Sequence, residues 1–295
     1  MQKMGFYLLT DASILCSYLT SRWWTRFEKH PEFRGVVVRE KRPDVSILQA
    51  RHAFHARYAG QHKLSADQWK ELIELYPKIS EAEQATIQAI VNTHGLCSDA
   101  VSHHPDTIFL DDDVNSETAR QWLQSITQTA SLPWLFSCIG QLFKPQWVDT
   151  LPGCLVNSHT AVLPYARGIY TIENIAATQD IVAFRQAAGF TIHYIDAQVD
   201  TGSIIRAERV VDPFRFKTLW DLKAYLYMSS FDCYINTAEV TLKCPETVPA
   251  GIIPDPALRG KNFKSKDFSA AKRHGAETGY LAMKEIVQLS ACSVP

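Results

Sequence analysis

Short apolar runs alternate along this chain with longer segments of mixed polarity. Runs of strand length lie at residues 5–10, 33–38, 107–110, 134–139, 155–158, 190–195 and 204–211. Several of the segments between them carry apolar residues at helical spacing. Strands interleaved with helices are typical of an α/β fold, here a Rossmann-like, mostly parallel twisted sheet with flanking helices. Ligands of such sheets bind beyond the carboxyl ends of the strands.

One segment departs from this alternation and predicts a helical insertion at about residues 45–100. Residues 64–93 carry apolar side chains at helical spacing, with Ser65 as an N-cap and Pro77 as a break. This pattern predicts two helices. The insertion is also the surface on which a lid or a homodimer contact is expected.

The last part of the chain predicts a helical extension. Residues 219–241 and 270–289 are helical in pattern. We therefore expect an α/β domain over residues 1–212 that contains the insertion, and a C-terminal helical extension over residues 213–295 packed on the same domain.

Composition and charge exclude several classes of partner. The 295 residues carry 30 Lys and Arg against 31 Asp and Glu, which gives a net charge of -1. This balance lacks the basic footprint of proteins that bind nucleic acid or anionic membranes. No apolar run approaches the length of a membrane span, and the N-terminus has no signal-peptide pattern. We expect a cytoplasmic protein with small-molecule ligands.

No metal or disulfide framework is expected either. The seven cysteines are widely spread without a C-x-x-C pair, so they indicate small buried residues. His52, His55 and His62 lack a cysteine or carboxylate at zinc spacing. The three carboxylates at residues 111–113 are more typical of a solvated turn than of a cation site.

The polar residues with the clearest chemical pattern follow the later strands. Asn157 and His159 are two positions apart, so in an extended strand they point to the same face. Asp200 follows the run at residues 190–195, and Gly202 suits a tight turn into the next strand. Each of these residues alone is typical of an ordinary capping, core or turn position. Together they predict an amide, an imidazole and a carboxylate in one site.

These motifs resemble the 10-formyltetrahydrofolate-dependent formyltransferases, in the branch that includes glycinamide ribonucleotide formyltransferase and small-molecule N-formyltransferases. The match consists of Asn157-Ser158-His159, Leu163-Pro164, and His193 followed seven residues later by Asp200-Thr201-Gly202, with the run at residues 134–145 upstream. It covers roughly residues 132–212.

The resemblance implies an N-formyltransferase that moves a formyl group from 10-formyltetrahydrofolate to an amine or hydroxylamine. The reaction passes through a tetrahedral intermediate with a negative oxygen, which the Asn157 amide and a protonated His159 would stabilise. Asp200, close to His159, would take the proton of the attacking nitrogen. His193 either points into this site or is a buried histidine bonded to a carbonyl.

The resemblance also assigns binding residues. For the folate, these are Ile139, Gln141, Leu142, Phe143, Ile195, Asp196 and Val199. For the acceptor, Asp11, Arg167 and Glu173 are candidates by charge pairing, against the alternative that they lie on the surface.

Departures from the family pattern reduce the number of possible formyl acceptors. The turn at residues 9–14 has no glycine for a phosphate, which disfavours a ribonucleotide. After Val210 only 85 residues remain in a chain without basic excess, which disfavours tRNA. Two acceptors remain, an amino sugar and N-hydroxyornithine of siderophore biosynthesis. Thr160 stands where the amino-sugar enzymes usually have proline, which weakly favours N-hydroxyornithine. The alternatives are a formyltetrahydrofolate hydrolase and a non-catalytic folate-binding module.

Overall fold

The chain folds into two units. The computed structural model describes residues 5–101, 104–128, 131–243 and 249–292. The first unit comprises Met1–Asn157 and Phe231–Pro249, and the second comprises Ser158–Ser230 and Ala250–Pro295. Each unit therefore contains segments that are distant in the sequence.

The first unit is built on parallel strands. They are β1 (Phe6–Asp11), β2 (Phe33–Arg39), β3 (Ile108–Phe109), β4 (Trp134–Cys138) and β5 (Leu155–His159), in the order β3-β2-β1-β4-β5. Val36, Val37 and Val38 of β2 are all fully buried, as expected for a parallel strand covered on both faces. All five expected strands of this unit are present.

Alternation along β1 determines which helices cover each face of that sheet. Phe6 contacts Trp23 of α1 (Ile14–Phe27), with ring centroids 6.4 Å apart. Tyr7, its neighbour, points the other way and contacts Trp122 of α5 (Glu117–Thr127) at 5.3 Å. On the second face, α6 (Pro145–Thr150) packs against α5 through Trp147. The strands are thus flanked by helices on both faces.

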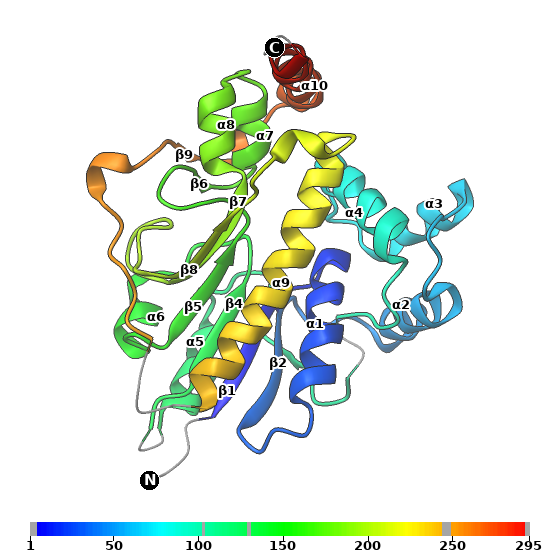
Figure 1. The fold of residues 1–295 in the computed structure, drawn as a ribbon. Helices are drawn as coiled ribbons and strands as arrows, with labels where there is room; N and C mark the ends of the chain where they lie inside the picture. Colours follow the sequence, from blue (N-terminus) through cyan, green and yellow to red (C-terminus); the bar gives the residue numbers. More distant parts are fainter. Residues whose placement is uncertain (1–4, 102–103, 129–130, 244–248, 293–295) are drawn as a thin grey trace. The chain divides into compact units, whose positions relative to one another are not determined.

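The insertion contains three helices, where the pattern predicted two. They are α2 (Val45–Tyr58), α3 (Ala66–Leu75) and α4 (Glu81–His94), drawn in light blue to cyan in Figure 1. Ser65 and Ser80 begin α3 and α4 with capping boxes. The sequence pattern did not predict α2, because few residues of this helix are buried and its apolar periodicity is therefore weak.

The second unit combines two small strand pairs with helices. β7 (Gly189–Tyr194) pairs antiparallel with β8 (Ile204–Arg209), and β6 (Arg167–Gly168) pairs with β9 (Asn262–Phe263). The helices include α7 (Thr171–Ala176), α8 (Ile181–Ala187) and α10 (Ala270–Cys292). Its core contains Phe184, Phe214 and Tyr280, and the Tyr280 hydroxyl donates to the carbonyls of Pro213 and Phe216.

Helix α9 (Leu219–Lys243) belongs to both units. In the first unit, Tyr234 of α9 donates its hydroxyl to the carbonyls of Ser137 and Val156 in two strands. Helix α9 thus starts in the second unit and ends in the first. The expected domains, an α/β domain over residues 1–212 and an extension over residues 213–295 packed on it, stay a prediction.

The expected α/β class, with a mostly parallel sheet and flanking helices, is confirmed. Across the described ranges, none of the helices has the length and apolar character needed to cross a membrane. Cys16, Cys97, Cys138, Cys154 and Cys233 are free thiols, three of them buried. Cys244 and the side chain of Cys292 lie outside the described residues.

Candidate active site

Three ionisable side chains meet in the second unit. His159 ends β5, His193 lies in β7, and Asp200 lies in the connection from β7 to β8. Asp200 Oδ2 is 3.8 Å from His159 Nδ1, and Asp200 Oδ1 is 3.5 Å from His193 Nε2. The two imidazole rings are perpendicular, with centroids 6.5 Å apart. The carboxylate therefore faces one imidazole with each of its oxygens.

The backbone around Asp200 fixes its side chain. Asp200 has a φ of 49°, a left-handed conformation that aspartate tolerates better than most residues. The backbone N–H of Gly168 donates to Asp200 Oδ2 at 2.7 Å. A Cβ atom at Gly202 would lie 1.8 Å from the carbonyl oxygen of Tyr194. Glycine is required there because the returning chain passes against the end of β7.

Backbone carbonyls determine which nitrogen of each imidazole carries a proton. His159 Nε2 is 3.0 Å from the oxygen of Ala166, and His193 Nδ1 is 2.8 Å from the oxygen of Tyr194. A carbonyl oxygen only accepts, so each of these nitrogens donates its N–H. The remaining nitrogen of each ring faces Asp200. This nitrogen carries a lone pair when the ring is neutral and an N–H donor when the ring is protonated.

Burial and charge act in opposite directions on Asp200. Burial of the carboxylate raises its pKa, but His159, His193, the Gly168 N–H and Arg167 outweigh it, so the pKa of Asp200 is below its usual value. Burial lowers the pKa of His193 despite the nearby carboxylate. Both shifts favour a carboxylate beside a neutral His193 at neutral pH.

The structure thus brings together His159 and Asp200 as expected, and adds His193 to them. His193 both faces Asp200 and bonds to a carbonyl, so it combines the two alternatives left open by the sequence. The sequence did not predict that the backbone N–H of Gly168 donates to Asp200. Its only signal in the sequence is the glycine after Arg167. Asn157 is the last residue of the first unit and lies two positions before His159 on β5.

One expected folate segment, residues 139–143, is a loop after β4 held by the turn after β3. Val114 N–H donates to Gln141 Oε1 at 2.8 Å, and Gln141 Nε2 donates to Asp113 at 2.6 Å. Asn115 Nδ2 donates to the carbonyl of Leu142 at 2.9 Å. The carboxylate turn therefore holds this loop in place, in addition to facing solvent.

Apolar side chains on the same loop suit a flat heterocycle. Leu142 is 63% exposed, which is unusual for a leucine in an ordered loop. Phe143 packs on Trp147 at a centroid distance of 5.0 Å, and Ile139 is half-buried. A contact of these side chains with a pterin stays a prediction.

The other expected folate segment, residues 195–199, lies in the second unit beside Asp200. Asp196 accepts the hydroxyl of Thr201 and the N–H of Gln198, which closes the loop on itself. Ile195 and Val199 are half-buried. The carbonyl of Val199 accepts from Arg167 at 3.4 Å. A backbone edge for a pterin at this segment stays a prediction.

The three residues expected to bind an acceptor are engaged inside the protein. Asp11 pairs with Arg39 at 2.6 Å and accepts the N–H of Gly140 at 2.8 Å. Arg167 also donates to the carbonyl of Gly260. Glu173 is 2% exposed and lies 3.2 Å from Lys223 Nζ. An acceptor role for these residues stays a prediction, and Glu173 is the least accessible of them.

Histidines of the insertion also have internal partners. His55 is buried between the carbonyl of Cys97 at 2.9 Å and the hydroxyl of Tyr76 at 2.8 Å. In the part of the chain that the structure describes, no group of three His, Cys, Asp or Glu side chains is placed to hold a metal ion.

Comparisons with known proteins match the region of this site. The family model described as formyl transferase matches residues 113–215, a range that contains the cluster of His159, His193 and Asp200. Methionyl-tRNA formyltransferase of Borrelia recurrentis (strain A1) is 27% identical over 135 residues. That alignment covers 44% of this chain and 40% of the relative, so the chain matches less than half of the relative's length.

Solved structures resemble nearly the whole chain. A sugar N-formyltransferase from Shewanella sp FDAARGOS_354 has a TM-score of 0.53 at 11% identity, covering 94% of this chain and 88% of that one. An N-formyltransferase from Helicobacter canadensis, in complex with folinic acid and dTDP-3-aminofucose, has a TM-score of 0.52 at 13% identity, covering 94% and 81%. At these identities the likeness is one of fold.

Proposed function

Because residues 113–215 match the family model described as formyl transferase, we propose that this protein is an N-formyltransferase that uses 10-formyltetrahydrofolate. The observation that carries the proposal is the buried Asp200 carboxylate between His159 and His193. Transfer of a formyl group to a nitrogen needs a base for the proton of that nitrogen and a donor for the developing oxyanion. The cluster supplies the base, and Asn157 supplies an amide donor.

Asp200 is suited to act as the proton acceptor. Its pKa lies below the usual value, so the carboxylate is ionised at neutral pH and has an oxygen available for a proton, and its side chain is only 13% exposed to water. The attacking nitrogen bonds to the formyl carbon and gives its proton to Asp200, directly or through His159. When the bond from carbon to the folate nitrogen breaks, the same proton passes to that nitrogen. Protons therefore balance without a further reagent.

His159 and His193 have different roles in this scheme. The Ala166 carbonyl fixes the ring of His159, so its other nitrogen can exchange a proton with Asp200. His193 is 2% exposed, and its Nε2 lies 3.5 Å from the second carboxylate oxygen, so we assign it a positioning role in which its ring limits by packing where the carboxylate can lie. The loop at residues 139–143 in the first unit and the segment at residues 195–199 in the second unit each remain a predicted folate contact, judged separately.

The proposed acceptor is an amino sugar carried on a nucleotide. The Shewanella and Helicobacter proteins, whose fold matches 94% of this chain, are described respectively as a sugar N-formyltransferase and as a complex with dTDP-3-aminofucose. N-hydroxyornithine, which the Thr160 loop weakly favoured, is the competing acceptor in the test.

The test is a turnover assay with the purified protein. It is mixed with 10-formyltetrahydrofolate and a panel of nucleotide-linked amino sugars, N-hydroxyornithine and simple amines, and tetrahydrofolate release is followed by absorbance. We expect release only with an amino sugar present. Formate release without an acceptor would indicate a hydrolase. Folate binding in calorimetry without any turnover would indicate a binding module.

Variants of the cluster test the mechanism. Asn157→Ala, His159→Ala and Asp200→Asn should each lower kcat about 100-fold or more, because single general acid–base groups contribute at that level. Glu208→Gln, an exposed carboxylate on β8, is the matched control and should keep the rate. Cluster variants that retain the rate within about threefold would show that the chemistry takes place elsewhere.

A further inference from the structure

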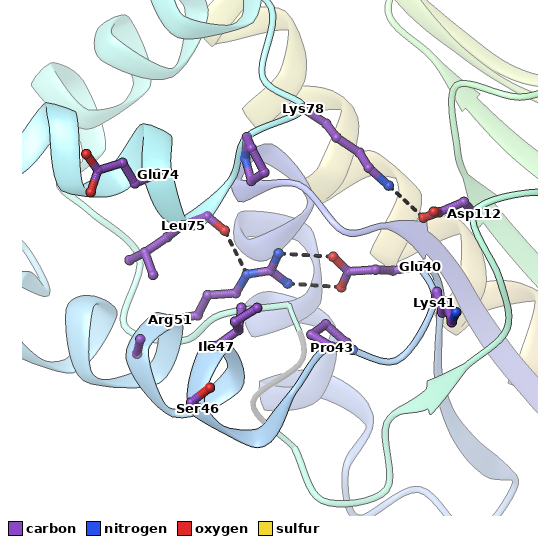
Figure 2. Close-up of a pocket in the computed structure, with 12 residues that line it drawn as sticks. Glu40, Lys41, Pro43, Ser46, Ile47, Arg51, Glu74, Leu75, Lys78 and Asp112 are labelled. Atoms are coloured by element: carbon purple, nitrogen blue, oxygen red, sulfur yellow. Dashed lines mark hydrogen bonds and ion pairs between the residues drawn. The ribbon is translucent and has the colours of Figure 1, made fainter.

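A cavity of about 420 Å³ lies in the first unit, between the helical insertion and the ends of two strands. Its walls come from the segment after β2, from α2, from the end of α3 and the connection after it, and from the turn after β3 (Figure 2). The lining residues are Glu40, Lys41, Pro43, Ser46, Ile47, Ala50, Arg51, Glu74, Leu75, Pro77, Lys78 and Asp112. No residue of the proposed formyl-transfer site lines it.

A rigid ion pair forms part of this cavity. The Arg51 side chain is 5% exposed, and its two terminal nitrogens donate to the two oxygens of Glu40 at 2.9 and 3.0 Å. Arg51 Nε donates to the carbonyl of Leu75 at 3.0 Å, and the guanidinium lies 4.8 Å from the centre of the Tyr76 ring. A two-pronged pair anchored on both sides has a fixed geometry. The cavity is thus preformed.

A second ion pair lies nearer to solvent. Lys78 Nζ is 2.6 Å from Asp112, with side chains 73% and 56% exposed. An exposed pair of this kind contributes little to stability. Pro43, Ile47, Ala50, Leu75 and Pro77 add apolar surface to the lining.

Two charged residues of opposite sign line the cavity in addition to these two ion pairs. Lys41 and Glu74 line the cavity, and within the described ranges neither side chain forms an ion pair. Figure 2 shows them on opposite sides of the Arg51–Glu40 pair. Both side chains are exposed, and Figure 2 shows the Glu74 carboxylate turned away from the Arg51–Glu40 pair, so the two charges lie at the edges of the lining, where each side chain has room to turn toward a ligand.

We propose that this cavity binds a small zwitterion whose ammonium and carboxylate are separated by a short apolar chain, such as an ω-amino acid, a basic amino acid or a dipeptide. The carboxylate pairs with Lys41, the ammonium pairs with Glu74, and the apolar chain covers Ile47 and Leu75. The volume lies within the range of small-molecule sites. The inference does not depend on formyl transfer, because every residue it uses lies outside the proposed catalytic cluster.

Calorimetry with 6-aminohexanoate as the probe tests this proposal, in the absence of any folate. We expect binding tighter than about 1 mM, and weaker binding of glycine, hexanoate and hexylamine, because each of them satisfies only one of the two charges or places both at one end. Ala50→Trp should abolish binding by filling the cavity. Equal binding of hexanoate and 6-aminohexanoate, or binding unaffected by Ala50→Trp, would overturn the proposal.

Charge-reversal variants provide a control for folding. Lys41→Glu and Glu74→Lys should each weaken 6-aminohexanoate binding at least about tenfold, the effect of losing one charged contact. The double variant should restore it, because the zwitterion can bind in the reverse orientation. Lys63→Glu, an exposed residue of the insertion outside the cavity, should have no effect. A double variant as weak as the single variants would contradict the two-charge recognition.

Discussion

At the scale of single residues, the proposed proton transfer depends on the distances from the Asp200 carboxylate to His159 and His193, which the local backbone determines. Asp200 reaches both imidazoles because its backbone adopts a left-handed conformation and because Gly202 lets the chain pass against β7. The same residue would be an ordinary turn aspartate if the loop relaxed. Two predictions follow from this arrangement.

Gly202→Ala should destabilise the protein and reduce its activity. The added Cβ atom would lie 1.8 Å from the Tyr194 oxygen, so the loop that carries Asp200 must move. We expect a loss of about 2 kcal/mol or more in the free energy of unfolding, measured by urea denaturation, together with slower turnover. Gly275→Ala is the control: its Cβ atom has space 3.9 Å from Ala177, and alanine is the better helix former in α10. It should be neutral or stabilising.

Buried His193 should make stability fall in mild acid. Burial lowers the pKa of His193 in the folded protein, whereas in the unfolded chain the imidazole protonates below about pH 6.5. The unfolded state then binds more protons, so the free energy of unfolding decreases as the pH falls. His193→Gln should reduce the difference in stability between about pH 7.5 and pH 5.5, measured by denaturant titration. The exposed His274→Gln should leave it unchanged, and an equal slope in both variants would argue against this assignment.

At the scale of elements, ion pairs join segments that the chain order keeps apart. In the second unit, Lys223 of α9 lies 3.2 Å from Glu173 of α7, with side chains only 4% and 2% exposed. In the first unit, Arg39 at the end of β2 binds Asp11 and the carbonyl of Asp112, while Asp11 binds Gly140 N–H. The ends of neighbouring strands are thereby tied to the loop expected to bind folate.

Lys223→Met should destabilise the second unit strongly. It leaves Glu173 buried without its counter-charge, which costs about 3 kcal/mol or more. The double variant Glu173→Leu with Lys223→Met should recover most of that loss, because it removes both charges together. Urea denaturation of the single and double variants measures this coupling. If the double variant retains catalysis, Glu173 does not bind the acceptor.

At the scale of the whole molecule, the charge balance predicts that this chain does not bind tRNA. Proteins that bind nucleic acid neutralise phosphates with clustered lysine and arginine, and this chain has a net charge of -1. We expect no retardation of tRNA in a gel-shift assay at about 0.1 M salt, where the Debye length is about 10 Å. A salt-dependent shift would favour a tRNA acceptor over an amino sugar.

The sequence alone determined the class of the fold and the approximate position of every major strand. Apolar runs of strand length are a local property, and so is the order Asn157, His159, Asp200 that indicated formyl transfer. It underestimated the insertion, because α2 buries few residues and has little apolar periodicity.

Only the tertiary structure decided which groups face each other. His193 is seven residues from Asp200 in the chain, and its contact depends on the path of the loop between β7 and β8. The Gly168 N–H and the cavity beside Arg51 arise from segments brought together by packing. Patterns along a chain report local preference and burial, whereas a site is made by distances between residues that are remote in sequence, and those distances exist only once the chain has folded.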